Sequence, residues 1–478
     1  MNRSFLSSAV FAMLLLSISA GALAADRPPN VILILIDDMG WTDLSCYGSK
    51  FYETPNIDKL AASGTRFTNG YSACTVCSPT RAAVMTGKYP ARLHITDWIA
   101  GHNRPFAKLK PPQWQQHLPL EETTIAEVFQ KAGYATCHIG KWHLGDEAYW
   151  PLKQGFDLNI GGNHRGQPPS YFFPYERNSI KLPGLGEGKP DEYLTDRLTD
   201  EAIAFVTANR EKPFFLYLPH YGVHTPLQAK PEKIAKYQAK AKAQVDNPQH
   251  NATYAAMIES LDEGIGRLVD HLDVLKLRED TIVVFTSDNG GLELNDVTDN
   301  APLRDGKGSA YEGGVRVPFI WSYPKNTMPG TVSDVPVMSI DILPTLFQLC
   351  GFEGSPRPGW HGVNIPRAFR GRDSNGARDA LFWHYPHYHP GGATPYGAVR
   401  MGDWRLVEFY EDNRVELYNL KQDIGETRNV AASEPAKRDE LLSRLRLWRG
   451  VNAQMPTPNA DYDPMKDAEG KKKKDKAT

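Results

Sequence analysis

The chain has 478 residues, which is enough for a large core and for more than one ordinary domain. Hydrophobic residues make up 41% of it, charged residues 23%, and the net charge is −2, as in an ordinary globular protein. This balance excludes a strongly basic nucleic-acid-binding protein, and we expect no nucleic-acid partner.

The first 24 residues are typical of a secretory signal peptide. Arg3 provides a positive start, residues 5–20 are mostly apolar, and Ala22-Leu23-Ala24 fits a small-x-small cleavage site. A membrane anchor is the alternative, but the apolar run is short for a bilayer span and no other stretch is long and apolar enough. We therefore expect an exported protein, periplasmic or extracellular, without stable membrane insertion.

Four short apolar runs, at 30–38, 134–143, 213–224 and 281–291, each end in polar residues. Continuous runs of this kind predict strands that are covered on both faces. Helical patterns at 123–133 and 253–275 lie between them, so the alternation predicts an α/β sheet with helices on both sides. Ligands of such sheets bind beyond the carboxyl ends of the strands, where these runs carry their Asp, Lys, His and Asn residues.

The composition changes after about residue 371. Residues 398–410 and 413–420 alternate like antiparallel strands, and residues 435–451 form an amphipathic helical pattern. We predict a signal peptide at 1–24, a main domain at 27–375, a smaller subdomain at 376–455 and a polar, loosely ordered tail at 456–478.

The stretch "SACTVCSPTRAAVMTGKYPAR", residues 72–92, contains a Cys-x-x-Cys pair, which could be a redox dithiol, half a zinc site or two plain thiols. The Ser78-Pro79 pair favours a helix start with Ser78 as the cap, which puts Cys77 at a helix amino end that favours anions. Arg81 lies one turn further along the same face. A nucleophile and an arginine at this position suit attack on a tetrahedral oxyanion, whereas Cys74 is expected to be a plain thiol or a disulfide partner.

This stretch resembles the sulfatase motif Cys-x-Pro-Ser-Arg with its following Thr-Gly-Lys/Arg, and Thr80 stands where the motif usually has serine. The stretches "PNVILILIDDMGW", "GKWHLG", "PHYGVHTP", "TSDNGG" and "GKGSAYEGGVRVP" also resemble sulfatase blocks and occur in family order, so that the resemblance spans residues 29–429. It implies an arylsulfatase or polysaccharide sulfatase with an alkaline-phosphatase-like fold. That fold has a large mixed β-sheet sandwiched by helices and a smaller C-terminal subdomain of antiparallel sheet and helix.

The resemblance also implies that a maturation enzyme oxidises Cys77 to formylglycine, whose hydrated aldehyde is the nucleophile. This would explain why the chain has an odd number of cysteines, five in all. Such sparse cysteines do not describe a disulfide scaffold.

Two pairs of polar residues end two of the predicted strands, and together they offer hard oxygen ligands to one cation: Asp37, Asp38, Asp288 and Asn289. Oxygen ligands favour calcium or magnesium over zinc. The resemblance implies one calcium ion, bridged by the modified Cys77 and a sulfate oxygen. The other interpretation is that these acids cap turns at strand ends.

Lys141 and His143 follow a strand and a glycine, so we place them on an irregular loop. The resemblance implies that Lys141 binds sulfate and that His143 bonds to the formylglycine hydroxyl and later takes its proton. His224 and Lys307 match the positions that meet the leaving-group oxygen. With Arg81 and the metal, the two lysines would neutralise a sulfate ester.

The substrate is less defined by the sequence. Loops at 163–178 and 381–392, with Trp98 and His102, are rich in aromatics and histidines that could contact a sugar or pack between the subdomains. His138 and His220 are expected to be structural. The leading hypothesis is hydrolysis of a sulfate monoester on a sulfated sugar or polysaccharide. The alternatives are a phosphate or phosphonate monoester hydrolase of the same fold and a non-enzymatic binder of sulfated glycans.

Overall fold

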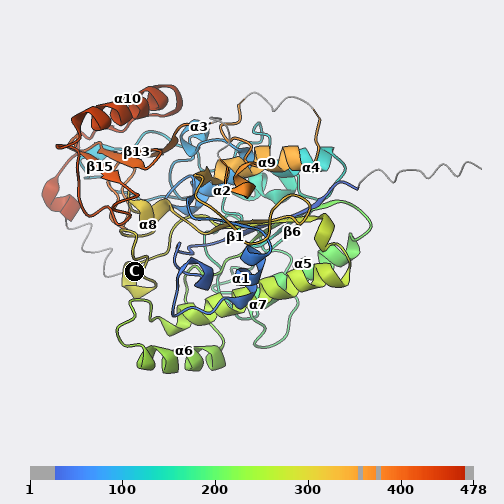
Figure 1. Cartoon of the computed structure of the whole chain (residues 1–478). Coiled ribbons are helices and arrows are strands. Elements are labelled where there is room, and N and C mark those ends of the chain that lie inside the picture. The colour runs from blue at the N-terminus through green and yellow to red at the C-terminus, as the bar shows by residue number, and fades with distance from the viewer. Residues whose placement is uncertain (1–26, 354–358, 373–377, 469–478) are drawn as a thin grey trace, which may run out of the picture.

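The computed structural model (Figure 1) describes residues 27–353, 359–372 and 378–468, so the predicted signal peptide at 1–24 lies outside the described residues. Within these ranges, no helix has the length and apolar character needed to cross a membrane. The main sheet has the order β10-β2-β9-β8-β1-β7-β5-β6. Its strands are β1 (Asn30–Ile36), β2 (Thr65–Phe67), β5 (Ala135–Ile139), β6 (Leu158–Ile160), β7 (Phe214–Pro219), β8 (Thr281–Ser287), β9 (Phe319–Ser322) and β10 (Thr331–Ser333).

Strand β1 lies at the centre of this sheet, parallel to both β7 and β8. Strand β5 is parallel to β7 and β6, whereas β9 runs antiparallel to β8 and β2, so the sheet is mixed, as predicted. Ile36, the last residue of β1, is in register with Ser287, the last residue of β8. The polar residues that follow these strands therefore meet at one edge of the sheet.

Helices cover both faces of the sheet (Figure 1). The side chains of Ile32, Ile34 and Ile36 belong to a core shared with α1 (Pro55–Ala62), α5 (Leu194–Ala208), α6 (Pro231–Ala243) and α7 (Ala252–Val274). The alternate residues of β1 face α2 (Cys77–Thr86), α4 (Ile125–Lys131) and α9 (Ile342–Leu349). Both faces of β1 are thus buried, which explains its continuous apolar run.

A separate antiparallel sheet of four strands follows in the chain, as predicted: β12 (Leu381–Tyr385), β13 (Tyr396–Met401), β14 (Trp404–Phe409) and β15 (Val415–Asn419). Helix α10 (Pro435–Asn452) buries Leu441 and Leu445 against it. The indole nitrogen of Trp383 donates to the carbonyl of Ser72 at 2.9 Å, which ties this sheet to the segment before Cys77. The proposed boundary at 375/376 lies outside the described residues and stays a prediction.

The polar segment 456–468, which we call the C-terminal strap, is more ordered than the sequence predicts. Strand β16 (Thr457–Pro458) pairs with β4 (Leu109–Lys110) in antiparallel register. The guanidinium of Arg104 donates to Asp467 through Nε at 3.1 Å and Nη2 at 2.6 Å. Composition cannot reveal such order, because it comes from backbone pairing and an ion pair rather than from apolar burial.

We predict that Asp467→Asn loosens the segment 104–110. The Arg104–Asp467 pair is largely buried, with side chains 19% and 16% exposed, and a charge-assisted bond of this kind contributes about 1.5 kcal/mol. Hydrogen exchange of the amides in 104–110 should therefore rise about tenfold. Asp379→Asn is the matched control because it breaks an exposed pair with Arg444. Equal exchange in the two variants would contradict the role of the strap.

Candidate active site

The four predicted metal ligands lie together at the carboxyl edge of the sheet. Asp37 and Asp38 follow β1, Asp288 and Asn289 follow β8, and all four are buried. The amide nitrogen of Asn289 donates to Asp38 Oδ1 at 2.8 Å, and the backbone N–H of Asp38 donates to Asp288 Oδ1 at 3.3 Å. The strand register therefore brings the two pairs into direct contact.

Cys77 is the first residue of α2, a helix whose ten residues are all buried. The structure corrects one detail, because the cap is Val76 and not Ser78. The hydroxyl of Ser78 instead accepts a hydrogen bond from the backbone N–H of Ile99 at 3.1 Å. Burial raises the pKa of the Cys77 thiol, and Lys141 and Lys307 lower it in part. The nucleophile candidate therefore stands at the positive end of a helix, as expected.

Cys74 takes a structural position three residues before Cys77. Its backbone N–H donates to the Thr80 hydroxyl at 3.0 Å, and this hydroxyl reaches the Cys74 carbonyl at 3.2 Å. Thr80, which stands where the motif usually has serine, thus uses its hydroxyl to hold the turn that leads into Cys77. Burial raises the pKa of the Cys74 thiol, and the structure has it unpaired.

Three cations, of which Arg81 and Lys141 are fully buried, pair with the three acids. Arg81 Nη2 lies 2.7 Å from Asp288 Oδ2, Lys141 Nζ lies 2.7 Å from Asp37 Oδ2, and Lys307 Nζ lies 2.7 Å from Asp38 Oδ1. Arg81 also donates to the carbonyl of Lys141 at 3.0 Å, so two of the cations are linked. Lys141 occupies the irregular segment after β5, as the sequence predicts.

The carboxylate and amide oxygens of this cluster fit a hard divalent cation. Asp37, Asp38, Cys77 and His224 each offer one ligand atom, and these four atoms lie within 4.8 Å of one another. Asp37 Oδ1 and Asn289 Oδ1 are buried oxygens without a hydrogen-bond donor in the part of the chain that the structure describes. Buried acceptors without a donor are costly, and carboxylate and amide oxygens are ligands that calcium prefers.

The neighbouring acids Asp37 and Asp38 differ in their pKa values. Burial raises the pKa of Asp37 to about 8, although Lys141 lowers it in part. Burial also opposes ionisation of Asp38, but Lys307 and His224 outweigh it and hold the pKa of this carboxyl below its usual range. A divalent cation would therefore lower the pKa of Asp37 more than that of Asp38, because it stabilises the carboxylate form.

His143 is a neutral imidazole with an available lone pair. Its Nε2 donates to the carbonyl of Ile99, which fixes the proton on that nitrogen. Its Nδ1 is buried and has no hydrogen-bond partner among the described residues. Burial, followed by Lys141, lowers the pKa of His143 well below its ordinary value. The residue also has φ 60°, a left-handed conformation that is uncommon outside glycine.

His224 lies on the more open side of the cluster. Its Nδ1 donates to the carbonyl of Thr225 at 2.8 Å, and its Nε2 lies 3.6 Å from Asp38 Oδ2. Burial, followed by Lys307, lowers the pKa of His224 to about 3. The side chains of His224 and Lys307 are 14% and 9% exposed, whereas those of Arg81 and Lys141 are fully buried. The site therefore opens toward His224 and Lys307.

The loop before β13 packs against the segment that carries Lys307, a contact that the sequence does not predict. The backbone N–H of Ala393 donates to the carbonyl of Gly308 at 2.9 Å, next to Lys307. A side chain at Gly308, where φ is +76°, would overlap the His389 ring. Burial lowers the pKa of His389, and His102 and Lys307 lower it further. A four-stranded sheet far along the chain thus supports the lysine of the main domain.

Other predicted residues are structural. His138 is buried in β5, with Nδ1 3.1 Å from Asn159 Oδ1, and His220 is buried as well. In the loop 163–178, Tyr171 and Tyr175 are fully buried and belong to a core cluster, so these two aromatics pack rather than face a ligand.

The comparisons with known proteins agree with this geometry. The sulfatase family model matches residues 29–352, and the model of the N-sulphoglucosamine sulphohydrolase C-terminal region matches residues 306–447. The chain is 32% identical to a sulfatase of Formosa agariphila, with 89% of each chain covered. It is 31% identical to human arylsulfatase A, with 92% of this chain and 91% of that protein covered.

A solved structure shares the fold over nearly the whole chain. The crystal structure of Ps i-CgsB in complex with k-i-k-neocarrahexaose is 31% identical, has a TM-score of 0.76, and is matched over 94% of this chain and 98% of that one. Family model, relatives and fold agree, and the chain belongs to the sulfatase family and is a sulfuric ester hydrolase.

Proposed function

We propose that the enzyme hydrolyses a sulfate monoester on a sulfated sugar or polysaccharide, with Cys77 converted to formylglycine. One calcium ion would be held by Asp37, Asp38, Asp288 and Asn289, with residue 77 as a further ligand. The complex of the neighbouring structure with k-i-k-neocarrahexaose supports a glycan substrate. We also propose that residues 1–24 direct export, that a formylglycine-generating enzyme modifies the chain, and that residues 27–375 form the catalytic domain and 376–455 its subdomain.

The observation that carries this proposal is the gradient of exposure across the basic side chains. Arg81 and Lys141 are fully buried beside Cys77, whereas Lys307 and His224 are 9% and 14% exposed. A sulfate group would bind with its inner oxygens at the buried cations. Its ester oxygen would then point toward Lys307 and His224, on the side where a bulky sugar has room.

Each of these side chains has a chemical role that follows from its surroundings. Arg81 and Lys141 would neutralise and orient the sulfate. His143, neutral with a free lone pair, would take a proton from the hydroxyl that residue 77 carries. Lys307 and His224 would donate to the leaving oxygen. An arriving anionic ester raises the pKa of His224 and favours its protonated form.

A calcium ion and formylglycine would supply the remaining chemistry. Calcium, when bound, would polarise a sulfate oxygen and offset its charge. Formylglycine would offer a hydrated aldehyde, which can release sulfate by re-forming the carbonyl, as a thiol or a simple hydroxyl cannot.

We predict that Cys77, and not Cys74, is converted to formylglycine in a host with the maturation system. Peptide mass spectrometry should find the aldehyde at residue 77 and an intact thiol at residue 74, which holds a structural turn. Cys77→Ser should abolish turnover, whereas Cys74→Ser should retain it if the protein folds. An unmodified Cys77 in fully active enzyme would contradict the proposed mechanism.

We predict one tightly bound calcium per chain and its loss in Asp288→Ala. The substitution leaves Arg81 without its carboxylate partner and removes one proposed ligand, so activity should fall at least about tenfold together with metal content. Elemental analysis measures the metal. Asp43→Asn is the control, since Asp43 is also buried near β1 but bonds to Gly40 and Tyr254. Stoichiometric zinc without calcium in active enzyme would show that the ligand argument is wrong.

We predict that His224→Ala slows sugar sulfates more than 4-nitrophenyl sulfate. A sugar alkoxide needs a proton to leave, which is worth about 10²–10⁴ in rate, whereas nitrophenolate leaves unaided. His143→Ala should slow both substrates alike, because sulfate release is common to both. The measurement is kcat/KM and burst size for each pair. Equal losses for His224→Ala on both substrates would refute its role. Faster hydrolysis of nitrophenyl phosphate than of every sulfate ester would favour the phosphatase alternative.

A further inference from the structure

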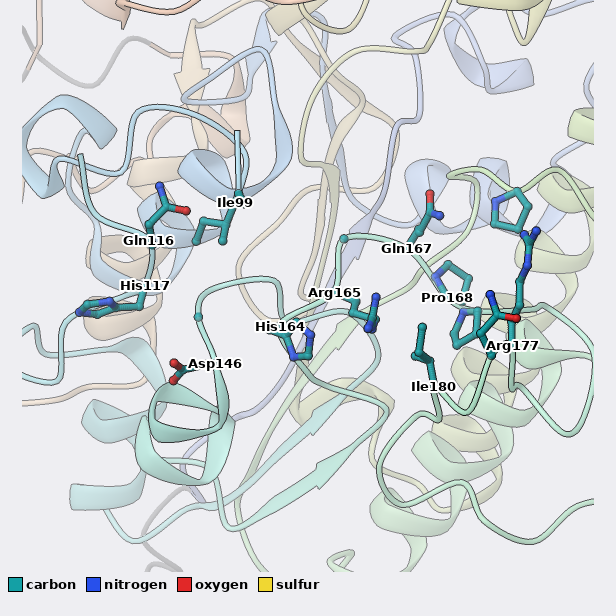
Figure 2. A pocket seen from close by; sticks show the side chains of 16 residues that line it. Ile99, Gln116, His117, Asp146, His164, Arg165, Gln167, Pro168, Arg177 and Ile180 are labelled. Atoms are coloured by element: carbon teal, nitrogen blue, oxygen red, sulfur yellow. The ribbon is translucent and has the colours of Figure 1, made fainter. Parts of the chain in front are cut away.

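The structure has a cavity of about 630 Å³, whose lining side chains are shown in Figure 2. It is lined by segments around Ile99, His117, Asp146 and 164–180, and by Pro226. Its size falls within the range of about 300–1,000 Å³ that is typical of ligand pockets. None of the residues assigned above to catalysis or metal binding lines it, so the proposed function leaves the cavity unexplained.

The cavity adjoins the reacting centre, because two of its lining residues contact His143. The carbonyl of Ile99, a lining residue, accepts the hydrogen bond from His143 Nε2. Gly166, also a lining residue, lies so close to the imidazole that an added Cβ would be 2.5 Å from His143 Cε1. Pro226 follows His224 by two residues. The parts of a substrate next to its reacting sulfate would therefore lie close to this cavity.

Two arginines give the cavity a positive lining (Figure 2). Arg165 uses its backbone N–H to bond Asn163 at 2.8 Å, and Arg177 bonds Ile180 through the backbone in both directions. Neither guanidinium has a carboxylate or hydrogen-bond partner within the ranges that the structure describes. Arginine offers a planar fork of donors that matches sulfate and carboxylate oxygens.

The nearby acids form no ion pair with these arginines among the described residues. Glu176, next to Arg177, pairs with Lys181 at 3.3 Å. Asp146 is the acid that lines the cavity, and its carboxylate accepts from the backbone N–H of Ala148 at 3.1 Å. Two arginines without a carboxylate partner among the described residues therefore line the cavity, and Arg177 is exposed.

We propose that this cavity binds a second anionic substituent of the substrate, a sulfate or a carboxylate, through Arg165 and Arg177. The preferred substrate would then be a glycan that carries more than one anionic group, of which only the sulfate at residue 77 is cleaved. The inference rests on the proposed function, because the first sulfate occupies the site at residue 77. Gln116 and Gln167 offer amides for sugar hydroxyls, and Pro168 and Ile180 offer apolar surface for a ring face.

The test is calorimetric binding to the calcium-loaded Cys77→Ser protein, which does not consume its ligand. The ligands are galactose 6-sulfate, a carrageenan tetrasaccharide with several sulfates, and a chondroitin tetrasaccharide with a single sulfate, whose other anionic groups are carboxylates. We expect both tetrasaccharides to bind more tightly than the monosulfated sugar if the cavity accepts either anion, and only the carrageenan if it accepts sulfate alone. Arg165→Gln and Arg177→Gln should each reduce this advantage about tenfold, the loss expected for one charge-assisted bond.

Two further variants make the result specific. Arg165→Lys, which keeps the charge but not the fork, should lose less than Arg165→Gln. Arg210→Gln is the matched control, because Arg210 is exposed and precedes the amino end of β7, at the opposite edge of the sheet. It should leave the advantage unchanged, and the thermal unfolding of every variant confirms that it is folded.

The outcomes separate this inference from the proposed function. If neither tetrasaccharide binds more tightly than galactose 6-sulfate, the cavity does not bind a second anion. The same conclusion follows if the arginine variants weaken the binding of all ligands equally. Either result leaves the proposed hydrolysis of a sulfate ester unaffected. If the arginine-dependent advantage is found but matured enzyme with residue 77 intact turns over no sulfate ester, the cavity binds anions and the proposed reaction is wrong.

Discussion

The pairing of buried charges at one edge of the sheet is the constraint on which the site depends. Three ion pairs meet there, Asp288–Arg81, Asp37–Lys141 and Asp38–Lys307. A buried charge that loses its partner costs about 3–5 kcal/mol, so each pair fixes the relative position of the two segments that it joins. The pairs link β8 to α2, β1 to the segment after β5, and β1 to the loop at residue 307. One electrostatic requirement thus assembles the site from segments that lie far apart in the sequence.

The same pairs prepare the site for an anionic ligand. The cations are held in place by the acids before any sulfate arrives, so little reorganisation is needed when negative charge develops. The late part of the chain completes this support. Trp383 donates to the segment before Cys77, and the loop at 389–393 bonds next to Lys307. The strap pairs with the segment 104–110. This segment begins a few residues after Ile99, whose carbonyl accepts the hydrogen bond from His143. The four-stranded sheet is therefore part of the active-site framework.

Much of this arrangement could be predicted, since strands buried on both faces have a clear signature. The runs around β1, β5, β7 and β8 and the rule that ligands bind at strand carboxyl ends were enough to bring Asp37, Asp38, Asp288 and Asn289 together. Features that depend on distant partners could not be predicted. The strap is polar and pairs with a segment some 350 residues earlier. Helix α2 begins at Cys77 with Val76 rather than Ser78 as its cap, and the Ser78 hydroxyl accepts a hydrogen bond from Ile99.

The loop at 163–178 is a second case in which the sequence does not predict the role of the side chains. Its aromatic residues could contact a sugar or pack, and Tyr171 and Tyr175 are buried in the core. Its arginines look like ordinary solvated charges in the sequence. Only the fold shows that Arg165 and Arg177 line one cavity without an acid to pair with. Composition can identify a loop of interest. Whether its side chains pack in the core or line a cavity depends on which residues surround them in the fold.

The burial of Cys77 sets a time limit on any enzyme that modifies it. The side chain is 3% exposed and begins a helix that is buried along its whole length, so a second protein cannot reach it in the folded state. Yet β8, which supplies the partner of Arg81, is synthesised long after residue 77. At roughly 5–20 residues per second the delay is on the order of ten to forty seconds. During that interval the segment has no completed core to enter, and the order of elements along the chain leaves the thiol accessible until the sheet closes over it.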